Sequence, residues 1–447
     1  MIKIYDTMTR SLRDFVPLTE NVVNMYVCGP TVYNYIHIGN ARSAVAFDTI
    51  RRYFEYCGYT VNYISNFTDV DDKIIKAANE AGISTKELSD KFIAAFMEDT
   101  GQLGIKPATQ NPRVINYMDE IIAFVSTLVD KGFAYVSEGD VYFRVAKSNN
   151  YAKLANKTLE DLEIGASGRT DAETERKENP LDFALWKAAK EGEVSWDSPW
   201  GPGRPGWHIE CSVMATEILG DTIDIHGGGA DLEFPHHTNE IAQSEAKTGK
   251  TFANYWMHNG FVNVDNEKMS KSLGNFVTVH DMLQTVDGQV LRFFLATQQY
   301  RKPINFTEKA IHDAEVNLKY LKNTHSLPLT EQVNQAELQT YLDAFQEAMD
   351  DDFNTANGVT VLFDMAKWIN SGNYDQTVKD AFEKMLQVFG IVFEEEVLDE
   401  DIEKLIEERQ VARANKDFAT ADRIRDELAA QGIKLLDTKE GVRWTRD

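Results

Sequence analysis

Three segments of the sequence hold side chains whose types and spacing suit chemistry on phosphates or metals. The first, "CGPTVYNYIHIGNAR" at 28–42, places His37 and Asn40 three residues apart around Gly39. It joins a strand-like run to a helix-like run, and the free N–H groups and positive dipole of a helix start bind anions. His37 and Asn40 could then face one bound phosphate. The alternative is an ordinary helix start with a packed histidine.

The second segment is a lysine loop, "EKMSKSLGN" at 267–275. Lys268 and Lys271 are separated by small and polar residues, and Gly274 allows the loop to bend. Two cations on such a loop suit the negative charge that develops on a departing pyrophosphate. The alternative is an ordinary solvated loop, because lysines are mostly exposed.

The third segment is "HGGGADLEFPHHTNE" at 226–240, which follows a strand-like run. Three successive glycines, Gly227, Gly228 and Gly229, allow the backbone to approach a ligand such as a nucleoside very closely. The same segment offers metal ligands, because His236 and Glu240 are four residues apart and fall on one face of a helix.

Two cysteines complete a possible metal site. With Cys28 and Cys211, His236 and Glu240 make a Cys₂HisGlu set that is typical of tetrahedral zinc. His237 lies three residues from Glu240, so the spacing alone leaves His236 and His237 open. The alternative is that both cysteines are buried core residues, which free cysteines usually are.

The elements that must position these segments follow the pattern of a parallel α/β sheet. The pattern at 21–29 predicts a buried strand, and the alternation at 59–67 predicts a second strand. The patterns at 39–58 and 71–82 predict helices. Strand, turn, helix, strand is the opening of a parallel sheet, whose ligands lie at the carboxyl ends of its strands. The segment that begins at Cys28 occupies that place.

The rest of the chain changes texture twice. Residues 118–136 predict a helix and 140–145 a strand, and a charged stretch over 146–205 indicates an insertion into the sheet domain. Strand-like runs at 222–229 and 260–265 are expected to resume the sheet. Helical segments and a short β-like end follow, at 308–325, 336–353, 357–370, 378–392, 403–432 and 433–447.

The composition bounds the class of protein. The chain has 447 residues, enough for about three domains, with 43% hydrophobic residues as in globular proteins. No run reaches the ~20 apolar residues of a membrane span, and no export signal is apparent at the start. Three cysteines, Cys28, Cys57 and Cys211, disfavour a disulfide framework. A cytoplasmic protein without membrane contact is expected.

The net charge of −25 at first disfavours a nucleic-acid partner. The excess acid is concentrated, however: residues 331–400 hold 16 acidic and three basic residues, whereas 401–447 hold 11 acidic and 10 basic. The total charge therefore does not exclude RNA.

Taken together, the motifs resemble those of a known family. "HIGN" and "KMSKS" are similar to the two signature motifs of class I aminoacyl-tRNA synthetases, with Asn40 where many class I enzymes have a second histidine. The wider text, including "GRPGWHIECS", "HGGGADLEFPHHTNE" and "KDFATADRIRDEL", resembles the bacterial cysteinyl-tRNA synthetases over nearly the whole chain.

The resemblance implies an α/β fold in four parts. These are a Rossmann-type parallel-sheet catalytic domain at 1–260 with an insertion at about 110–205, a lysine-loop and stem-contact region at 261–320, a helical bundle at 321–400, and a small mixed anticodon-binding region at 401–447.

It also implies roles for individual residues. ATP would be bound by Thr31, His37, Gly39, Asn40, Gly227, Gly228, Gly229 and Lys271, and catalysis supported by His37, Asn40, Lys268 and Lys271. Cysteine would be held by Gly29, Thr68, Trp207 and Asp231. The zinc ligands would be Cys28, Cys211, His236 and Glu240, which favours His236 over His237.

The function that the resemblance implies is ligation of L-cysteine to tRNA(Cys). Cysteine would attack the α-phosphate of ATP, supplied with Mg²⁺, and the resulting adenylate would pass its aminoacyl group to the terminal ribose of the tRNA. One zinc per chain would bind the cysteine thiolate and so reject serine. A hydrophobic pocket alone would discriminate between cysteine and serine only ~10–200-fold. No editing domain is expected. The protein is expected to be a monomer.

The basic residues of the tail have two interpretations. They could contact phosphates and anticodon bases, or pair with neighbouring acids on solvated helix faces. The residues concerned are Arg409, Arg413, Lys416, Arg423 and Arg425.

Two other functions compete with this one. A related ligase that joins cysteine to an amino-sugar, in low-molecular-weight thiol synthesis, would share the zinc and ATP motifs but lack the long tail, so residues 320–447 discriminate the two. A non-catalytic RNA-binding relative would be expected to have lost the lysine loop or the histidine turn, and both are intact.

Overall fold

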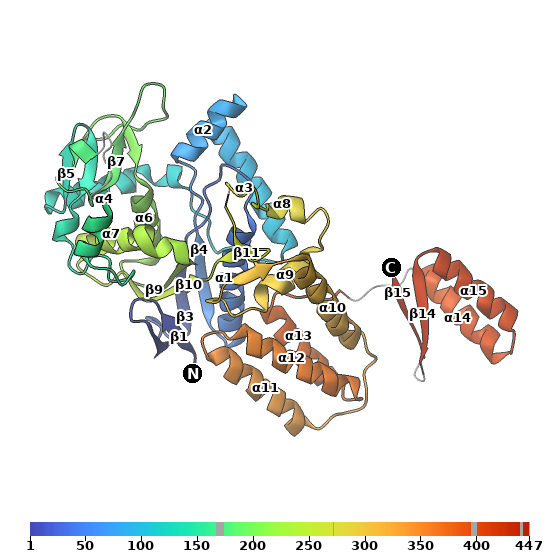
Figure 1. The fold of residues 1–447 in the computed structure, drawn as a ribbon. Coiled ribbons are helices and arrows are strands. Elements are labelled where there is room, and N and C mark those ends of the chain that lie inside the picture. Colours follow the sequence, from blue (N-terminus) through green and yellow to red (C-terminus); the bar gives the residue numbers. More distant parts are fainter. Residues whose placement is uncertain (167–173, 271, 395–399, 439–440, 447) are drawn as a thin grey trace.

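The structure, a computed structural model, is built around a four-stranded parallel sheet (Figure 1). It describes residues 1–166, 174–270, 272–394, 400–438 and 441–446. The strand order is β10-β9-β3-β4, and each neighbouring pair is parallel. The strands are β3 (Val22–Val27), β4 (Thr60–Ser65), β9 (Ile223–Gly229) and β10 (Ala253–Asn259). This arrangement confirms the parallel α/β fold expected from the sequence.

Strands β3 and β9 are neighbours although the insertion separates them in the sequence. Tyr26 pairs with His226 and Val27 with Gly227, and the Cys28 N–H donates to the Gly227 carbonyl at 3.3 Å. Because parallel strands end at the same edge of a sheet, this register brings the segment that begins at Cys28 beside the glycine run.

Helix α1 (Ile38–Tyr56) connects β3 to β4 and begins at the histidine turn. His37 is its N-cap: the His37 ring accepts a hydrogen bond from the Asn40 N–H at 3.2 Å, and the Asn40 side chain accepts one from the His37 N–H at 3.1 Å. This reciprocal capping box fixes the start of the helix. The helix predicted over 39–58 is confirmed to within two residues.

The insertion folds as an antiparallel sheet in the order β5-β6-β7-β8, with helices beside it (Figure 1). Its elements are α4 (Met118–Asp130), β5 (Ala134–Ser137), β6 (Asp140–Phe143), α5 (Leu159–Ala166), β7 (Phe183–Ala188) and β8 (Gly203–Pro205). Part of the charged stretch, 167–173, lies outside the described residues.

The prediction of one helix over 118–136 is wrong for the last third of that range. Helix α4 ends at Asp130, and Gly132, with φ +80°, turns the chain into β5. Glu138 and Gly139 have φ of +52° and +85°, the backbone of a two-residue hairpin turn, so β5 pairs with β6 instead of extending the helix.

The run at 260–265 does not resume the main sheet. Strand β11 (Val262–Val264) pairs with β12 (Glu267–Lys268) and β13 (Ile304–Phe306) in a separate small sheet. The chain leaves the main sheet at Gly260, where a Cβ atom would lie 2.6 Å from the Lys302 backbone. The main sheet is completed by β10, which the sequence analysis did not predict.

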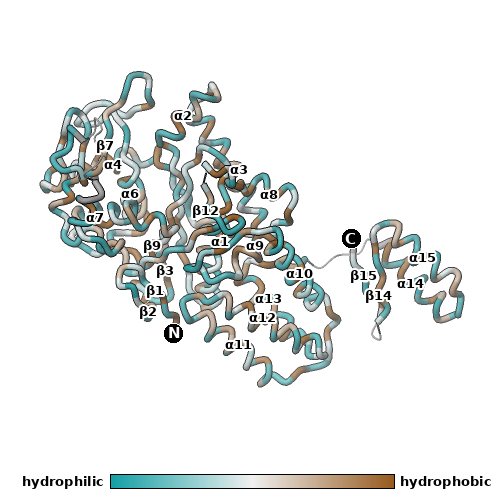
Figure 2. The backbone as a smooth tube through the Cα atoms, in the orientation of Figure 1, coloured by the Kyte–Doolittle hydropathy of each residue, from teal (hydrophilic) through white to brown (hydrophobic). Residues whose placement is uncertain are grey.

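An antiparallel pair, β1 (Lys3–Asp6) and β2 (Ser11–Asp14), precedes the main sheet, and the other named elements before the last hairpin are mostly helices. In Figure 2 hydrophobic and hydrophilic positions alternate along them, as expected for helices packed on one side. The helices are α2 (Asp72–Ala81), α3 (Thr85–Gln102), α6 (Trp207–Leu219), α7 (Thr238–Thr248), α8 (Val279–Met282), α9 (Gly288–Ala296), α10 (Glu308–His325), α11 (Gln335–Asp350), α12 (Thr355–Asn370), α13 (Gln376–Val388), α14 (Glu400–Ala414) and α15 (Phe418–Ala430).

The C-terminal part departs from its prediction in one respect. The helical stretch predicted over 403–432 is two helices, α14 and α15, because the chain turns at Lys416, where φ is +61°. The hairpin of β14 (Ile433–Thr438) and β15 (Gly441–Arg446) follows and confirms the β-like end. Within the described ranges, the structure contains no helix with the length and hydropathy required to cross a bilayer.

A buried ion pair joins α1 to two later helices. Arg292 of α9 is fully buried, and its Nη1 lies 2.7 Å from Asp48 Oδ2 on α1. Arg292 Nε donates to the carbonyl of Phe389, just after α13, at 2.9 Å. Burial alone would raise the pKa of Asp48, but Arg292 and Arg52 together lower it below its usual value.

Removing the charge of Asp48 should destabilise the protein far more than removing an exposed one. Asp48→Asn leaves the buried Arg292 guanidinium uncompensated, so we expect the free energy of unfolding to fall by about 3 kcal/mol in urea denaturation. The matched control is Asp313→Asn in the exposed Lys309–Asp313 pair, expected to cost at most about 0.5 kcal/mol. Equal losses in the two variants would contradict a structural role for the buried pair.

Candidate functional site

A cavity of about 620 Å³ opens at the carboxyl ends of the central strands. That size lies within the usual range of small-molecule sites. Its wall includes most of the residues predicted to bind ATP and cysteine. Those that line it are Gly29, Thr31, His37, Gly39, Asn40, Trp207, Gly229 and Asp231. Cys28, predicted as a zinc ligand, and Lys268, predicted to support catalysis, line it as well.

Three other predicted residues are packed beside the cavity. Thr68 is 2% exposed and its carbonyl accepts a hydrogen bond from the N–H of Val32 at 3.1 Å, which braces the segment after Cys28. A Cβ on Gly227 would lie 2.4 Å from the Phe47 ring, and one on Gly228 would lie 2.9 Å from Leu232. Close packing within the protein therefore accounts for the lack of a side chain at Gly227 and Gly228, whereas Gly229 faces the cavity.

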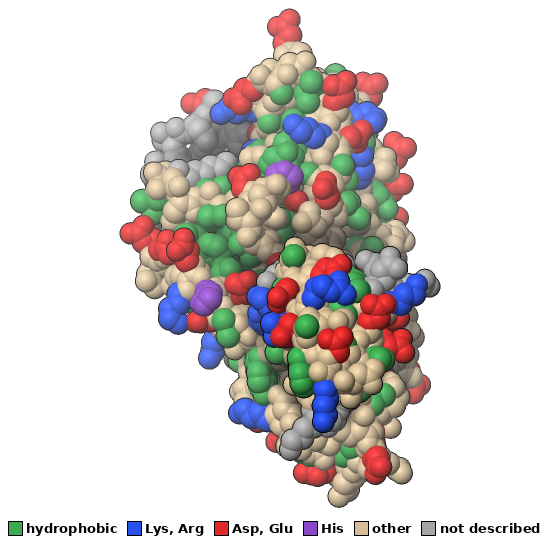
Figure 3. Space-filling view, turned by 90° about the vertical axis from the view of Figure 1, so that its right-hand side faces the viewer, with side chains coloured by type: hydrophobic (Ala, Val, Ile, Leu, Met, Phe, Trp, Pro, Cys, Tyr) green, Lys and Arg blue, Asp and Glu red, His purple; other side chains and the backbone are tan. Residues whose placement is uncertain are grey.

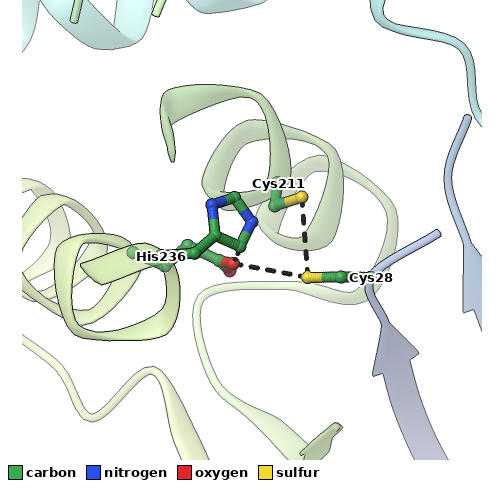
Figure 4. Close-up of side chains that lie close together, drawn as sticks. Cys28, Cys211 and His236 are labelled. Atoms are coloured by element: carbon green, nitrogen blue, oxygen red, sulfur yellow. Dashed lines mark hydrogen bonds and ion pairs between the residues drawn. The ribbon is translucent and has the colours of Figure 1, made fainter. Parts of the chain in front are cut away.

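Cys28, Cys211, His236 and Glu240 meet beside the cavity, which Cys28 lines. In Figure 4 the side chains of Cys28, Cys211 and His236 point toward one another. The Cys28 and Cys211 sulfur atoms are 3.7 Å apart, and Cys28 Sγ lies 3.5 Å from Glu240 Oε1. His236 Nε2 lies 3.0 Å from the same oxygen. Cys28 follows β3, Cys211 is on α6, and His236 and Glu240 straddle the start of α7, so three elements supply the cluster.

A second set of possible ligands shares two members with the first. Cys28, His226, His237 and Glu240 also lie close enough to hold a metal ion. His237 Nε2 is 3.4 Å from Cys28 Sγ, and His226 Nε2 is 2.6 Å from Glu240 Oε2. The structure therefore brings both His236 and His237 to the cluster, and sequence reasoning did not foresee His226 there.

The outer nitrogens of two of these rings have partners of their own. His236 Nδ1 lies 3.0 Å from His208 Nδ1, while His237 Nδ1 lies 2.8 Å from His258 Nε2. The Trp207 ring stacks on His236 with centroids 4.2 Å apart. Because Trp207 also lines the cavity, it forms a wall between the cluster and the open space.

The cluster strongly shifts the protonation of its members. Burial alone would raise the pKa of Glu240, but His226 and His236 lower it to about 2, so Glu240 is an anion. A hydrogen bond from Cys28 lowers the pKa of Cys211 to about 6 in spite of burial. Burial, with His226 and His258 nearby, holds the pKa of His237 well below its usual range. Burial alone would lower the pKa of His236, but Glu240 and Cys211 raise it to about 10. Burial raises the pKa of Cys28. A divalent metal bound here would therefore displace protons from His236 and Cys28.

The histidine turn and the lysine loop meet at the other end of the cavity. Gly39 lies beneath Met269, whose Cε would be 3.6 Å from a Cβ at position 39. Lys268 is exposed and its Nζ lies 5.6 Å from the centre of the Phe261 ring. Lys271, predicted to contact ATP, lies outside the described residues.

Asn66 is a residue that sequence reasoning missed. It is 1% exposed and follows β4, where its Oδ1 accepts a hydrogen bond from the Gly29 N–H at 2.9 Å. Its Nδ2 donates to Thr68 Oγ1 at 3.2 Å. Asn66 thus holds the chain that follows Cys28 against the next strand. In the sequence Asn66 lies within the strand predicted over 59–67, and its position near the end of that strand was its only mark.

The four arginines of the predicted tail set pair with acids in the structure, while Lys416 is exposed. Arg409 makes a two-pronged ion pair with Asp437, at 2.8 and 2.9 Å, and Arg413 Nη1 lies 2.6 Å from the same carboxylate. Two further pairs are Arg423–Glu427 at 3.5 Å and Arg425–Asp422 at 3.3 Å. Figure 3 shows positive and negative side chains interspersed on this side of the molecule. A role of these arginines in RNA binding stays a prediction.

Comparison with known proteins places the chain. Residues 14–316 match the family described as tRNA synthetases class I (C) catalytic domain, 344–394 the DALR domain and 395–444 the cysteinyl-tRNA ligase anticodon binding domain. A cysteine–tRNA ligase of Streptococcus thermophilus (strain CNRZ 1066) is 95% identical over 447 residues, all of both chains. The chain belongs to the cysteine–tRNA ligase family.

Other members of the cysteine–tRNA ligase family and one related fold extend this result. Ligases of Streptococcus pyogenes serotype M6 and Streptococcus agalactiae serotype III are 84% and 82% identical, again over both full chains. A Mycobacterium tuberculosis methionyl-tRNA synthetase, solved in complex with methionyl-adenylate, has a TM-score of 0.60 at 16% identity, over 82% of this chain and 89% of that one. At that identity the likeness shows the shared class I fold.

Truncation of Asn66 should loosen the segment that carries Cys28. Asn66→Ala leaves the Gly29 N–H without its partner, so we expect the free energy of unfolding to fall by about 1–3 kcal/mol, measured by chemical denaturation. The control is Asn62→Ala, which removes a partly exposed contact with Asn24 and should cost less than about 1 kcal/mol. If Asn66→Ala were as mild as this control, Asn66 would not hold the segment.

Proposed function

We propose that this protein ligates L-cysteine to tRNA(Cys) in two steps, through a cysteinyl-adenylate. The observation that carries the proposal is that the Cys₂HisGlu cluster adjoins, through Cys28, one end of the cavity whose other end is lined by the histidine turn and Lys268. The first end suits a thiol and the second suits phosphates. Membership of the cysteine–tRNA ligase family supplies the acceptor, tRNA(Cys).

The cluster has the dimensions of a zinc site. With Zn–S bonds of about 2.3 Å, two sulfur ligands of a tetrahedral zinc lie about 3.8 Å apart, and the Cys28 and Cys211 sulfurs are 3.7 Å apart. Nitrogen and oxygen ligands would be about 3.3 Å apart by the same geometry, against 3.0 Å for His236 and Glu240. The residues present fit one zinc ion per chain.

We assign His236, not His237, to the ligand set. The alternative set needs His226 as a ligand, but His226 Nε2 lies only 2.6 Å from Glu240 Oε2. That distance is farther from the ~3.3 Å expected between two ligands of one zinc than the 3.0 Å of His236. As a hydrogen-bond partner, His226 would orient the Glu240 carboxylate, as partners of metal ligands commonly do. The His237 ring would similarly contact Cys28 without binding the metal. When bound, zinc supplies a site that prefers a thiolate to a neutral hydroxyl, which separates cysteine from serine.

Other residues of this end would hold the amino acid in place. Trp207 walls the cavity beside His236, and Asp231 and Gly29 line the same space. Thr68, although buried, supports the chain after Gly29 through its backbone. We propose that these residues orient the amino acid so that its carboxylate points toward the phosphate end, since positioning of reactants is a large part of catalysis in such transfers.

At the phosphate end, the start of α1 provides the anion site. We propose that the triphosphate of ATP, with Mg²⁺, lies against Thr31, Gly39 and the capping box of His37 and Asn40. The backbone of Gly229 would lie against the nucleoside. Lys268 and Lys271 would neutralise the pyrophosphate as the bond to the α-phosphate breaks.

The four-part division of the chain expected from the sequence is also proposed here. The catalytic domain would span 1–260, followed by the lysine-loop and stem-contact region, the bundle and the anticodon-binding region from 401. The match of residues 395–444 to an anticodon binding domain favours a tRNA over an amino-sugar as acceptor. A monomeric state and a cytoplasmic location stay predictions.

Zinc binding is tested directly on purified protein. We expect one zinc per chain, and a loss of at least about tenfold in zinc affinity in Cys211→Ala and His236→Ala, measured by metal analysis and chelator competition. The matched control Cys57→Ala should keep the wild-type affinity, since Cys57 lies at the end of α1, away from the cluster. Zinc retained in His236→Ala but lost in His237→Ala would instead favour the second ligand set.

The activity is tested by exchange of pyrophosphate into ATP. We expect cysteine-dependent exchange without tRNA, reduced by at least about a hundredfold in kcat in Lys268→Ala and Lys271→Ala while both variants stay folded. Serine should support exchange far more weakly than cysteine. Charging of purified tRNA, run beside an amino-sugar acceptor, then decides the second step. If no amino acid supported exchange, the assignment of the protein as an enzyme would be refuted.

A further inference from the structure

The segment that follows the lysine loop is hydrogen-bonded to the histidine turn. The Ile38 N–H donates to the Val277 carbonyl at 3.1 Å, and the Val279 N–H donates to the Ile36 carbonyl at 2.9 Å. His37 and Thr278 thereby form a short antiparallel bridge. The two regions at the phosphate end are thus joined through their backbones, although more than half of the chain separates them in sequence.

His280, just after this bridge, lies between the histidine turn and a third element. Its ring stacks on the Tyr35 ring, with centroids 4.2 Å apart and an interplanar angle of 11°. Its Nδ1 lies 3.1 Å from Asp99 Oδ1 on α3. The ring therefore contacts two residues of different elements at once.

Asp99 is well placed to fix this ring. Its side chain is 2% exposed, and His280 is the partner of its Oδ1, while its Oδ2 has no hydrogen-bond partner among the described residues. Burying a carboxylate is destabilising when its hydrogen bonds are lost, so the contact of Asp99 with His280 should be kept in the folded protein. The Tyr35 ring is held in turn by Phe92 of α3, edge to face at 5.3 Å.

We infer that His280 is a positioning residue for the activation step. Its contacts with Tyr35 and Asp99 fix the start of α8, and with it the Phe276–Val279 segment, against the histidine turn. The lysine loop ends at Asn275, two residues before Val277, whose carbonyl is hydrogen-bonded to Ile38. A movement of α8 would therefore displace the end of the lysine loop relative to His37 and Asn40. This inference rests on the proposed function, because it needs the histidine turn and the lysine loop to act on one substrate.

His280 is separate from the Cys₂HisGlu cluster. The Cys₂HisGlu cluster adjoins the other end of the cavity and is built from β3, α6 and α7, none of which His280 contacts among the interactions described. Loss of the His280 contacts should therefore impair the use of ATP while cysteine binding and zinc binding are kept. A general loss of folding would impair all three.

The experiment compares two substitutions of His280 by pyrophosphate exchange, with rates normalised to active sites. His280→Leu removes the contact with Asp99 and the planar stack, so we expect kcat to fall about tenfold, the effect associated with one hydrogen bond to a charged group. The KM for cysteine and the zinc content should stay within twofold of wild type. His280→Arg should restore most of the activity, because a guanidinium stacks on an aromatic ring and pairs with a carboxylate.

Two further variants sharpen the result. Asp99→Leu should lower kcat as His280→Leu does, and the double variant should be no worse than either single variant, because the two residues act through one contact. The control His312→Leu changes an exposed histidine of α10 and should leave all parameters unchanged. Wild-type kcat in His280→Leu, or a KM for cysteine that rises with the fall in kcat, would overturn the inference. Absence of exchange in the wild type would instead refute the proposed function.

Discussion

The stability of the structure depends on how the buried Glu240 carboxylate and the polar groups around it are compensated. Glu240 is fully buried and anionic, and two cysteine sulfurs and five imidazoles lie around it or behind its neighbours. A carboxylate in such a place is destabilising unless hydrogen bonds and a cation compensate it. His226 supplies a hydrogen bond, and a divalent metal would supply the charge. Because the donors come from β3, α6 and α7, compensation of this carboxylate also holds those three elements together.

The second constraint is the short connection from this cluster to the histidine turn. Cys28 follows β3 and His37 caps the start of α1, so one segment carries both a sulfur of the cluster and the start of a helix. Its path is fixed from both sides: the Cys28 N–H is bonded to Gly227 of β9, and the Gly29 N–H to Asn66 after β4. A thiol at one end and a triphosphate at the other would therefore be held at a separation that the sheet itself sets.

Local periodicity was enough to predict much of this arrangement. The strands at Val22 and Thr60, the helix between them and the helix at 308–325 follow from patterns within a few residues. Residue type and spacing indicated the cluster of Cys28, Cys211 and Glu240 but left His236 and His237 open, and only the family resemblance favoured His236. The errors lie where non-local contacts decide. Residues 260–265 have a strand pattern, but the choice of sheet depends on Gly260 packing on the Lys302 backbone. Asn66, His226 and His280 act through partners distant in sequence, and no local pattern marks them.

Helix α1 shows how the phosphate end could be linked to the rest of the chain. Its first turn holds the capping box of His37 and Asn40. One turn later Arg42 donates to the carbonyls of Leu295 and Gln299, and further along Asp48 pairs with Arg292, which reaches Phe389 beyond α13. A single helix therefore carries the histidine turn at one end and contacts the helices after the lysine loop along its length. Through Asp48 and Arg292 the same helix is joined to the end of α13, so one element links the helical bundle to the histidine turn.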